Sequence, residues 1–165
     1  MTSDLLAGLI VLDFTRVLAG PYCTRLMADL GARVIKVERP GDGDDTRAFY
    51  LQLEEGRGDQ SSYFVRFNAG KESIAIELGN PQAKEVVFDL ARKSAVLIEN
   101  FVPGVMARHG FGYEAIAKVN PSIVYCSISG YGQTGPLRDR PAFAHLINAA
   151  SGAMDLDRQG SPDPR

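Results

Sequence analysis

The sequence lacks most features that mark specialised classes of protein. Its two cysteines, Cys23 and Cys126, have no metal-binding spacing and make no disulfide framework, so we expect free thiols in a reducing cytosol. No apolar run approaches the roughly 20 residues that span a bilayer. The N-terminus also lacks a basic segment that leads into an apolar one, as in a signal peptide. These absences predict a cytoplasmic protein without a membrane partner.

A strong excess of charge is also missing. The net charge is −2 over 165 residues, which gives no general attraction to nucleic acid or to an anionic membrane. With 45% hydrophobic and 23% charged residues, the composition is that of an ordinary soluble domain, and the length suffices for a single core. A polyanionic ligand would therefore have to be held by local basic residues.

Short apolar runs alternate with helical patterns along most of the chain. Strands are expected at 9–14, 33–38, 73–78, 95–98 and 123–128, and helices at 21–30, from 81 onward, and at 103–108, 113–119 and 142–154. The polar stretch 41–62 is expected to be a surface loop with some helix in its middle, and 63–68 a short helical or extended piece. Such alternation predicts an α/β fold, Rossmann-like, with a doubly wound, mainly parallel sheet flanked by helices.

Two expectations concern individual helices. The helix from 81 should present Val86, Val87, Leu90 and Ala91 as one apolar face. After 154 the chain becomes polar, and its acidic residues are expected to be exposed to solvent.

The segment 12–44 is the most informative part of the chain. Gly20 allows a turn after the first strand, Pro21 suits the first turn of a helix, and Gly31 suits its left-handed C-terminal cap. A second strand then ends at Glu38. This βαβ unit leaves strand ends beside a helix N-terminus, where ligands bind in open α/β sheets.

A dinucleotide is one candidate ligand for this crevice. Glu38 has the position of the acid that would bind a ribose, but the turn from Val17 to Pro21 contains one glycine instead of the G-x-G-x-x-G pattern. The pyrophosphate would lack its close backbone approach, which argues against NAD.

Three motifs in order carry a resemblance to a known family. They are VLDFTRVLAGPYCTRLMADLGARVIKVERPGDGDDTR, VLIENFVPGVMARHGFGY and SIVYCSISGYGQTGP. The chain resembles the family III CoA-transferases of the CaiB/BaiF type, which include formyl-CoA transferase. Members are much longer proteins, so residues 1–165 resemble the N-terminal, CoA-binding domain portion of one. The resemblance implies a soluble enzyme that uses coenzyme A or acyl-CoA as substrate, holds no permanent cofactor or metal, and forms an interlocked homodimer.

The resemblance also implies a set of CoA-binding residues. They lie at expected strand ends or helix starts, where N–H groups face outward and arginines meet phosphates or stack on adenine. The set is Arg16, Val17, Leu18, Ala19, Arg39, Ile76, Glu77, Leu78, Gly79, Asn100, Phe101 and Arg108. Read without the family, Arg39 is a solvated loop residue, Arg108 complements a helix dipole and Phe101 is a core aromatic.

Two positions depart from related proteins. Leu18 stands where formyl-CoA transferase has glutamine, and leucine cannot hydrogen-bond a reacting carbonyl, which argues against a formyl or oxalyl substrate. Phe143 and Ala144 stand where α-methylacyl-CoA racemases have a catalytic His-Asp pair, which argues against a racemase. Arg140, Phe143 and His145 are candidate substrate contacts, and His109 is expected to be a surface or capping residue.

The glycine-rich segment 129–136 lacks the Lys-Ser/Thr ending of a P-loop. It is either a strand-terminal loop near the substrate, with Tyr131 and Gln133 as hydrogen-bonding groups, or a purely structural turn.

The catalytic nucleophile implied by the family is an aspartate that forms a mixed anhydride and then an aspartyl-CoA thioester. By register it falls after Arg165, because Asp155, Asp157 and Asp163 stand too early. The resemblance therefore predicts a transferase that moves CoA from an acyl-CoA, such as succinyl-CoA, to a small carboxylic acid, with residues 1–165 inactive alone. A non-catalytic CoA-binding fragment is the alternative.

Overall fold

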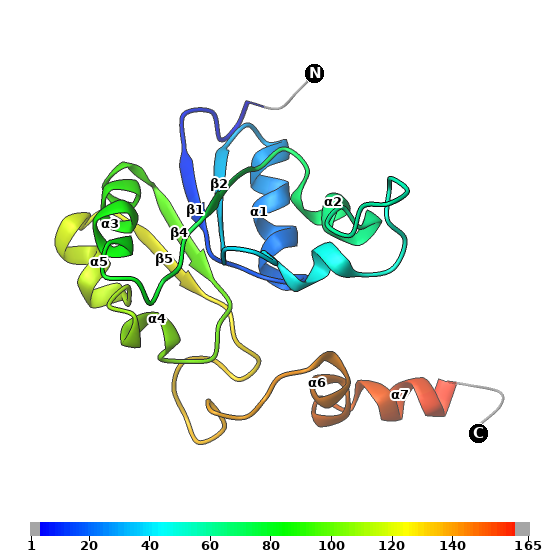
Figure 1. The fold of residues 1–165 in the computed structure, drawn as a ribbon. Helices are drawn as coiled ribbons and strands as arrows, with labels where there is room; N and C mark the ends of the chain where they lie inside the picture. Colours follow the sequence, from blue (N-terminus) through cyan, green and yellow to red (C-terminus); the bar gives the residue numbers. More distant parts are fainter. Residues whose placement is uncertain (1–3, 161–165) are drawn as a thin grey trace. The chain divides into compact units, whose positions relative to one another are not determined.

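The computed structural model describes residues 4–160, which divide into two compact units (Figure 1). The first unit ends at Ile128 and the second begins at Ser129. Each unit is described by itself.

The first unit is built on a five-stranded sheet. The strands are β1 (Ile10–Asp13), β2 (Arg33–Glu38), β3 (Glu72–Ala75), β4 (Val96–Glu99) and β5 (Val124–Ser127). Their order is β3-β2-β1-β4-β5, and every neighbouring pair is parallel. The predicted doubly wound parallel sheet is confirmed.

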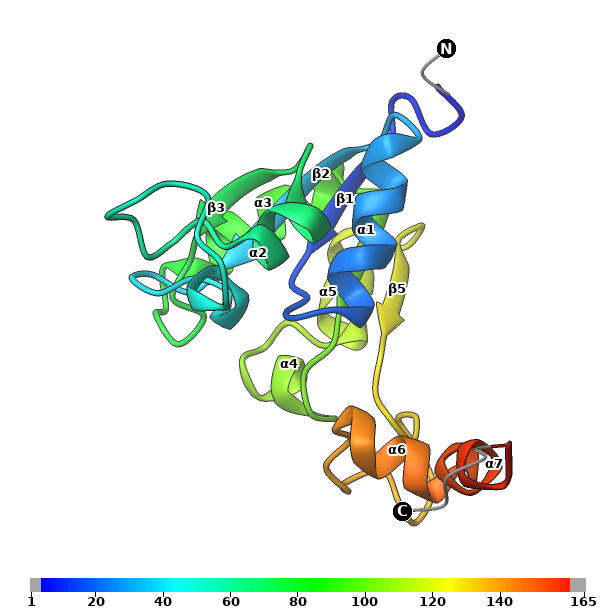
Figure 2. The same ribbon diagram turned by 90° about the vertical axis from the view of Figure 1, so that its right-hand side faces the viewer.

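Helices cover both faces of this sheet (Figures 1 and 2). On one face lie α1 (Ala19–Asp29) and α2 (Ser62–Asn68), and on the other lie α3 (Ala83–Lys93) and α5 (Tyr113–Val119). The short α4 (Val105–Arg108) lies near the carboxyl ends of the strands, and the 3-10 helix η1 (Asp45–Ala48) follows β2. Gly31, with φ 96°, ends α1 in the left-handed conformation that its sequence position predicts.

Alternate residues of each central strand pack into two separate cores. Leu12, Ile35 and Leu97 face the core that includes Val87 of α3 and Ile116 of α5. The intervening strand residues, Val11, Val34 and Ile98, form a smaller cluster with Met27 and Ala28 of α1 against it. This period of two explains why the central strands are largely apolar, because both of their faces are buried.

The direction in which successive strands are added to the sheet reverses between β1 and its neighbour β4. The first three strands extend toward one edge, and β4 and β5 then extend toward the other. The loops that follow β1 and β4 therefore meet at a switch point, where ligands bind in open α/β sheets.

Three expectations about local structure were wrong in part. Helix α3 begins at Ala83 instead of 81, and Val86 is 43% exposed, whereas Val87 and Ala91 are fully buried. In the polar stretch 41–62, η1 confirms the expected helix, but Asp44, Thr46 and Ser61 are buried. Their polar atoms are buried together with partners, which composition alone does not reveal.

The second unit contains two helices instead of one long one. The helix predicted over 142–154 is divided into α6 (Ala144–Ala150) and α7 (Ala153–Gly160), because Gly152 adopts φ 81° between them. Neither helix has a buried residue. Asp155 and Asp157 are exposed on α7, as expected, and Asp163 lies outside the described residues. Within residues 4–160, no helix is long and apolar enough to cross a membrane.

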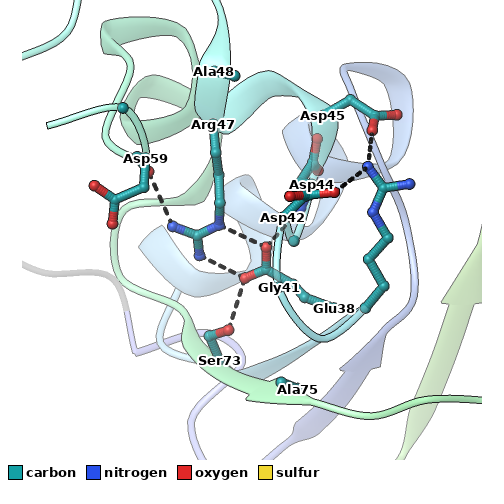
Figure 3. Close-up of a pocket in the computed structure, with 13 residues that line it drawn as sticks. Glu38, Gly41, Asp42, Asp44, Asp45, Arg47, Ala48, Asp59, Ser73 and Ala75 are labelled. Atoms are coloured by element: carbon teal, nitrogen blue, oxygen red, sulfur yellow. Dashed lines mark hydrogen bonds and ion pairs between the residues drawn. The ribbon is translucent and has the colours of Figure 1, made fainter.

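Buried ion pairs attach the loops to the sheet. Glu38, at the end of β2, accepts hydrogen bonds from Arg47 Nη2 at 2.6 Å and Nε at 2.8 Å, from Ser73 Oγ at 2.7 Å and from the Asp44 amide at 2.9 Å (Figure 3). Burial alone would raise the pKa of Glu38, but these hydrogen bonds and the Arg47 charge outweigh it and lower the pKa to about 2.

A second buried ion pair involves the last residue of β1. Asp13 is fully buried, and its Oδ2 lies 3.1 Å from Lys71 Nζ, just before β3. Thr24 of α1 donates to the same carboxylate at 2.6 Å. Burial lowers the pKa of Lys71 to about 8, although the Asp13 charge opposes the shift.

Two adjacent valines of α3 provide a test of the core. Val87→Ala should lower the free energy of unfolding by about 2–3 kcal/mol, because it removes two buried methyl groups and leaves a cavity. Val86→Ala, the matched control on the exposed side, should change it by less than about 0.5 kcal/mol. Urea denaturation measures both, and equal effects would contradict the assigned face of α3.

The Glu38 cluster predicts an acid-sensitive fold. Because the pKa of Glu38 is lowered in the folded state, its contribution to stability is present above about pH 4.5 and is lost as the pH falls toward 2. The loss amounts to at most about 3 kcal/mol. Urea denaturation between pH 2 and 7 should show a smaller acid-dependent loss for Glu38→Gln than for the unsubstituted chain. Glu85→Gln, on the exposed side of α3, is the control and should retain the full loss.

Candidate functional site

A cleft of about 210 Å³ opens at the carboxyl ends of the strands, and we call it the sheet-edge cleft. Phe14 and Arg16 reach it after β1, and Phe101 reaches it after β4, so it lies at the switch point of the sheet. Its complete lining is Phe14, Arg16, Val37, Glu38, Arg39, Ile76, Glu77, Leu78, Phe101, Val105 and His109.

The cleft gathers half of the residues that the family resemblance assigns to CoA. Arg16, Arg39, Ile76, Glu77, Leu78 and Phe101 all line it. The other six are outside the lining: Val17, Gly79, Asn100 and Arg108 each adjoin a lining residue in sequence, and Leu18 and Ala19 follow Val17 in the loop 16–19. His109, expected to be a surface or capping residue, is the C-cap of α4, is half-buried and lines the cleft.

The cleft combines cationic and apolar groups. The Arg16 guanidinium lies over the Phe101 ring, 5.1 Å from its centroid, which is within the range of a cation–π contact. Arg39 Nη2 lies 2.6 Å from Asp45 and 3.8 Å from Asp42, and its side chain is 40% exposed. Arg39 Nε is buried and has no hydrogen-bond partner within residues 4–160. A planar anionic or aromatic group fits these features.

The loop after β1 is held by partners from two other strands. Asn100, after β4, accepts a hydrogen bond from the Arg16 amide and donates one to the Arg16 carbonyl, both at 2.8 Å. Lys36 of β2 donates to the Thr15 carbonyl at 2.7 Å. The Asp44 carboxylate accepts a weak bond from the Val17 amide at 3.3 Å. The backbone of three successive residues is thus held in place.

Asp44 is itself held in the ionised form. Its Oδ2 lies 3.0 Å from Lys36 Nζ, with both side chains almost completely buried. Burial would raise the pKa of Asp44, but the Lys36 charge and the hydrogen bonds from Thr46 lower it overall. Lys36 and Asp44 are not among the site residues predicted from the sequence, although a lysine within an apolar strand indicates that its charge must have a buried partner.

A larger cleft of about 570 Å³, the loop cleft, shares Glu38 and Arg39 with the first. Figure 3 shows the residues that line the loop cleft. Four aspartates line the loop cleft, and its second arginine, Arg47, forms an ion pair with Glu38. The Glu38 carboxylate, which a dinucleotide site would use to bind a ribose, is therefore already bound by Arg47. This observation agrees with the missing glycines in arguing against NAD.

The remaining candidate residues lie in the second unit. Arg140, Phe143 and His145 are all exposed, Phe143 by 71%, and His145 belongs to α6. Gln133 donates to Ser129 Oγ at 3.1 Å, which is a contact within its own turn. Their roles as substrate contacts stay predictions. Across residues 4–160, no group of three or more His, Cys, Asp or Glu side chains is placed to hold a metal ion.

Comparisons with known proteins identify the family of this chain. Residues 6–165 match the family described as CoA-transferase family III. The chain is 50% identical over 147 residues to an acetyl-CoA:oxalate CoA-transferase of Acetobacter aceti, covering 89% of this chain and 37% of that protein. It is 46% identical over 159 residues to the succinyl-CoA:glutarate CoA-transferase of Mus musculus, covering 96% and 36%.

A solved structure shares the fold. The crystal structure of a CaiB/BaiF family protein from Brucella suis matches with a TM-score of 0.87 and 40% identity, over 97% of this chain and 42% of that one. The chain thus spans well under half the length of these relatives. Because the family match covers nearly the whole sequence and the fold agrees, the chain belongs to CoA-transferase family III.

Proposed function

We propose that this chain is the acyl-CoA-binding portion of an enzyme that transfers CoA from an acyl-CoA to a carboxylic acid. The observation that carries the proposal is the sheet-edge cleft, which brings together residues from 16 to 101 that a sequence resemblance had selected independently. Strand-end clefts of this kind are the usual ligand sites of open α/β sheets.

The groups in the cleft suit the chemistry of coenzyme A. The paired Arg16 and Phe101 side chains offer a surface on which adenine stacks. Arg39 provides charge for a phosphate, which would compete with Asp45 for the guanidinium. Arg108, exposed on α4, is a second phosphate ligand in this proposal. Because the net charge is −2, these local arginines have to supply the attraction.

The chemistry that we propose for the whole protein uses a covalent intermediate. A carboxylate attacks the thioester carbonyl of the acyl-CoA, which gives a mixed anhydride and releases the CoA thiolate. The thiolate attacks the enzyme-side carbonyl of the anhydride, forming an enzyme thioester and freeing the first acid. An acceptor carboxylate then takes the CoA through the reverse steps. The nucleophilic aspartate falls beyond Arg165 in this proposal, so the 165 residues have no catalytic residue of their own.

Leu18 directs the choice of substrate. Its side chain is 44% exposed next to the start of α1 and offers no hydrogen bond to a reacting carbonyl. We therefore favour a succinyl-CoA donor and a longer dicarboxylic acceptor such as glutarate over oxalate. The similar proteins include enzymes named for each acid.

The remaining features of the proposal concern the cellular setting. Cys23 and Cys126 are free, which is compatible with a reducing cytoplasm. We propose an interlocked homodimer for the full-length protein, with neither nucleic acid nor membrane as a partner.

Binding of coenzyme A is the first test. Calorimetry on the 165-residue chain should detect CoA, and Arg39→Ala should weaken the affinity by about tenfold or more, because a charge-assisted phosphate contact is lost. Arg33→Ala is the matched control, since Arg33 lies at the amino end of β2, away from the cleft, and forms an ion pair with Glu72. It should leave the affinity unchanged. Absence of CoA binding by the folded chain would refute the proposed site.

Catalysis is the second test. Succinyl-CoA incubated with this chain and a panel of acids that includes glutarate and oxalate should yield no new acyl-CoA by chromatography, because the attacking carboxylate is missing. Sustained turnover would contradict the placement of the nucleophile beyond Arg165.

A further inference from the structure

Val17 has a backbone conformation that its side chain disfavours. Its φ is 68°, and Val17 and Tyr50 are the two residues other than glycine with positive φ in the described part of the chain. A β-branched residue in this region is a true outlier, so the backbone of Val17 is strained. The Val17 side chain is 39% exposed, so burial of its methyl groups does not offset the cost.

The strain is imposed by contacts to the backbone on either side. Asn100 uses its amide oxygen for the Arg16 N–H and its amide nitrogen for the Arg16 carbonyl, which closes a ring of two hydrogen bonds. Just before it, Lys36 holds the Thr15 carbonyl, and just after it, Asp44 receives the Val17 N–H. Asn100 makes two hydrogen bonds of 2.8 Å, both to the residue directly before Val17, whereas Lys36 and Asp44 make one bond each to the neighbouring residues, so we treat Asn100 as the principal constraint.

The consequence lies one residue further along the chain. Because Arg16 is fixed and Val17 turns in the left-handed sense, Leu18 and Ala19 pass directly into the start of α1. If Val17 had a negative φ, the chain would leave Arg16 in another direction, and Leu18 and Ala19 would lie elsewhere. Gly20 lies so close to the Thr15 side chain that a β-carbon there would be 2.2 Å from it, so the start of α1 packs directly against the end of the β1 segment.

We propose that Asn100 is a positioning residue that acts through the backbone of Arg16, holding the loop 16–19 in the strained form that receives acyl-CoA. This inference rests on the proposed function and goes beyond it, because it assigns to Asn100 a role in shaping the loop in place of direct contact with CoA. The side-chain amide is already engaged on both of its polar atoms.

The experiment combines a ligand-independent readout with a binding readout. Asn100→Ala should accelerate hydrogen exchange of the Arg16 and Val17 amides by about tenfold or more relative to the amides of β1, and should shift their NMR resonances. It should also weaken coenzyme A binding by about tenfold in calorimetry. Asn100→Asp keeps an acceptor for the Arg16 N–H but loses the donor, so its effects should be intermediate.

Asn120→Ala is the matched control. Asn120 is buried, whereas Asn100 is half-buried, and like Asn100 it uses its side-chain amide on the backbone: it donates to the carbonyls of Ala91 and Ser94, but it precedes β5, away from the loop 16–19. It should lower stability without altering exchange at Arg16 or CoA affinity.

The outcomes separate the two proposals. If the unsubstituted chain does not bind CoA, the proposed function fails, and the exchange and NMR data alone decide whether Asn100 shapes the loop. The positioning role is overturned if the Arg16 amide of Asn100→Ala exchanges at the rate of the unsubstituted chain. It is also overturned if exchange and NMR shifts show an altered loop in a variant that still binds CoA with the affinity of the unsubstituted chain. If Asn100→Ala does not fold, the same two readouts on Asn100→Asp decide.

Discussion

The structure depends on a charge buried where a sheet would normally hold only apolar groups. Lys36 is in the middle of β2, and its side chain is 2% exposed. An isolated ammonium there would cost several kcal/mol, so the fold needs a counter-ion within reach. Asp44 provides it at 3.0 Å, and the Thr15 carbonyl adds a hydrogen bond. The segment after β2 therefore has to fold back over the end of the sheet.

The same principle fixes the other loops at the carboxyl edge. Glu38 holds Arg47 and Ser73, and Asp13 holds Lys71, so ion pairs and hydrogen bonds attach the segments after β2 and around β3. Removing one partner of such a pair leaves an uncompensated charge and typically costs about 3–5 kcal/mol. The end of the sheet that carries the sheet-edge cleft is consequently held by buried contacts without a ligand, an arrangement that would lower the entropic cost of binding.

Most of the first unit could be predicted from the sequence because both faces of its strands are apolar and its turns carry glycine. The predicted strand 33–38 matches β2, and Gly31 ends α1 as expected. The prediction failed where a partner distant in sequence decides the outcome, as for the buried Asp44. The family resemblance selected six residues of the cleft, but it did not reveal that Arg39 is paired with Asp45, because that pairing exists only in the folded loop.

The bond between Asn100 and Arg16 joins residues 84 positions apart. Contacts of such long range form late, because the intervening chain must first be ordered. The first strand and its helix are made early during synthesis, yet the loop between them has no constraint on Arg16 until β4 pairs beside β1. On the ribosome, a nascent chain shorter than about 100 residues would carry the sequence of this loop without its shape.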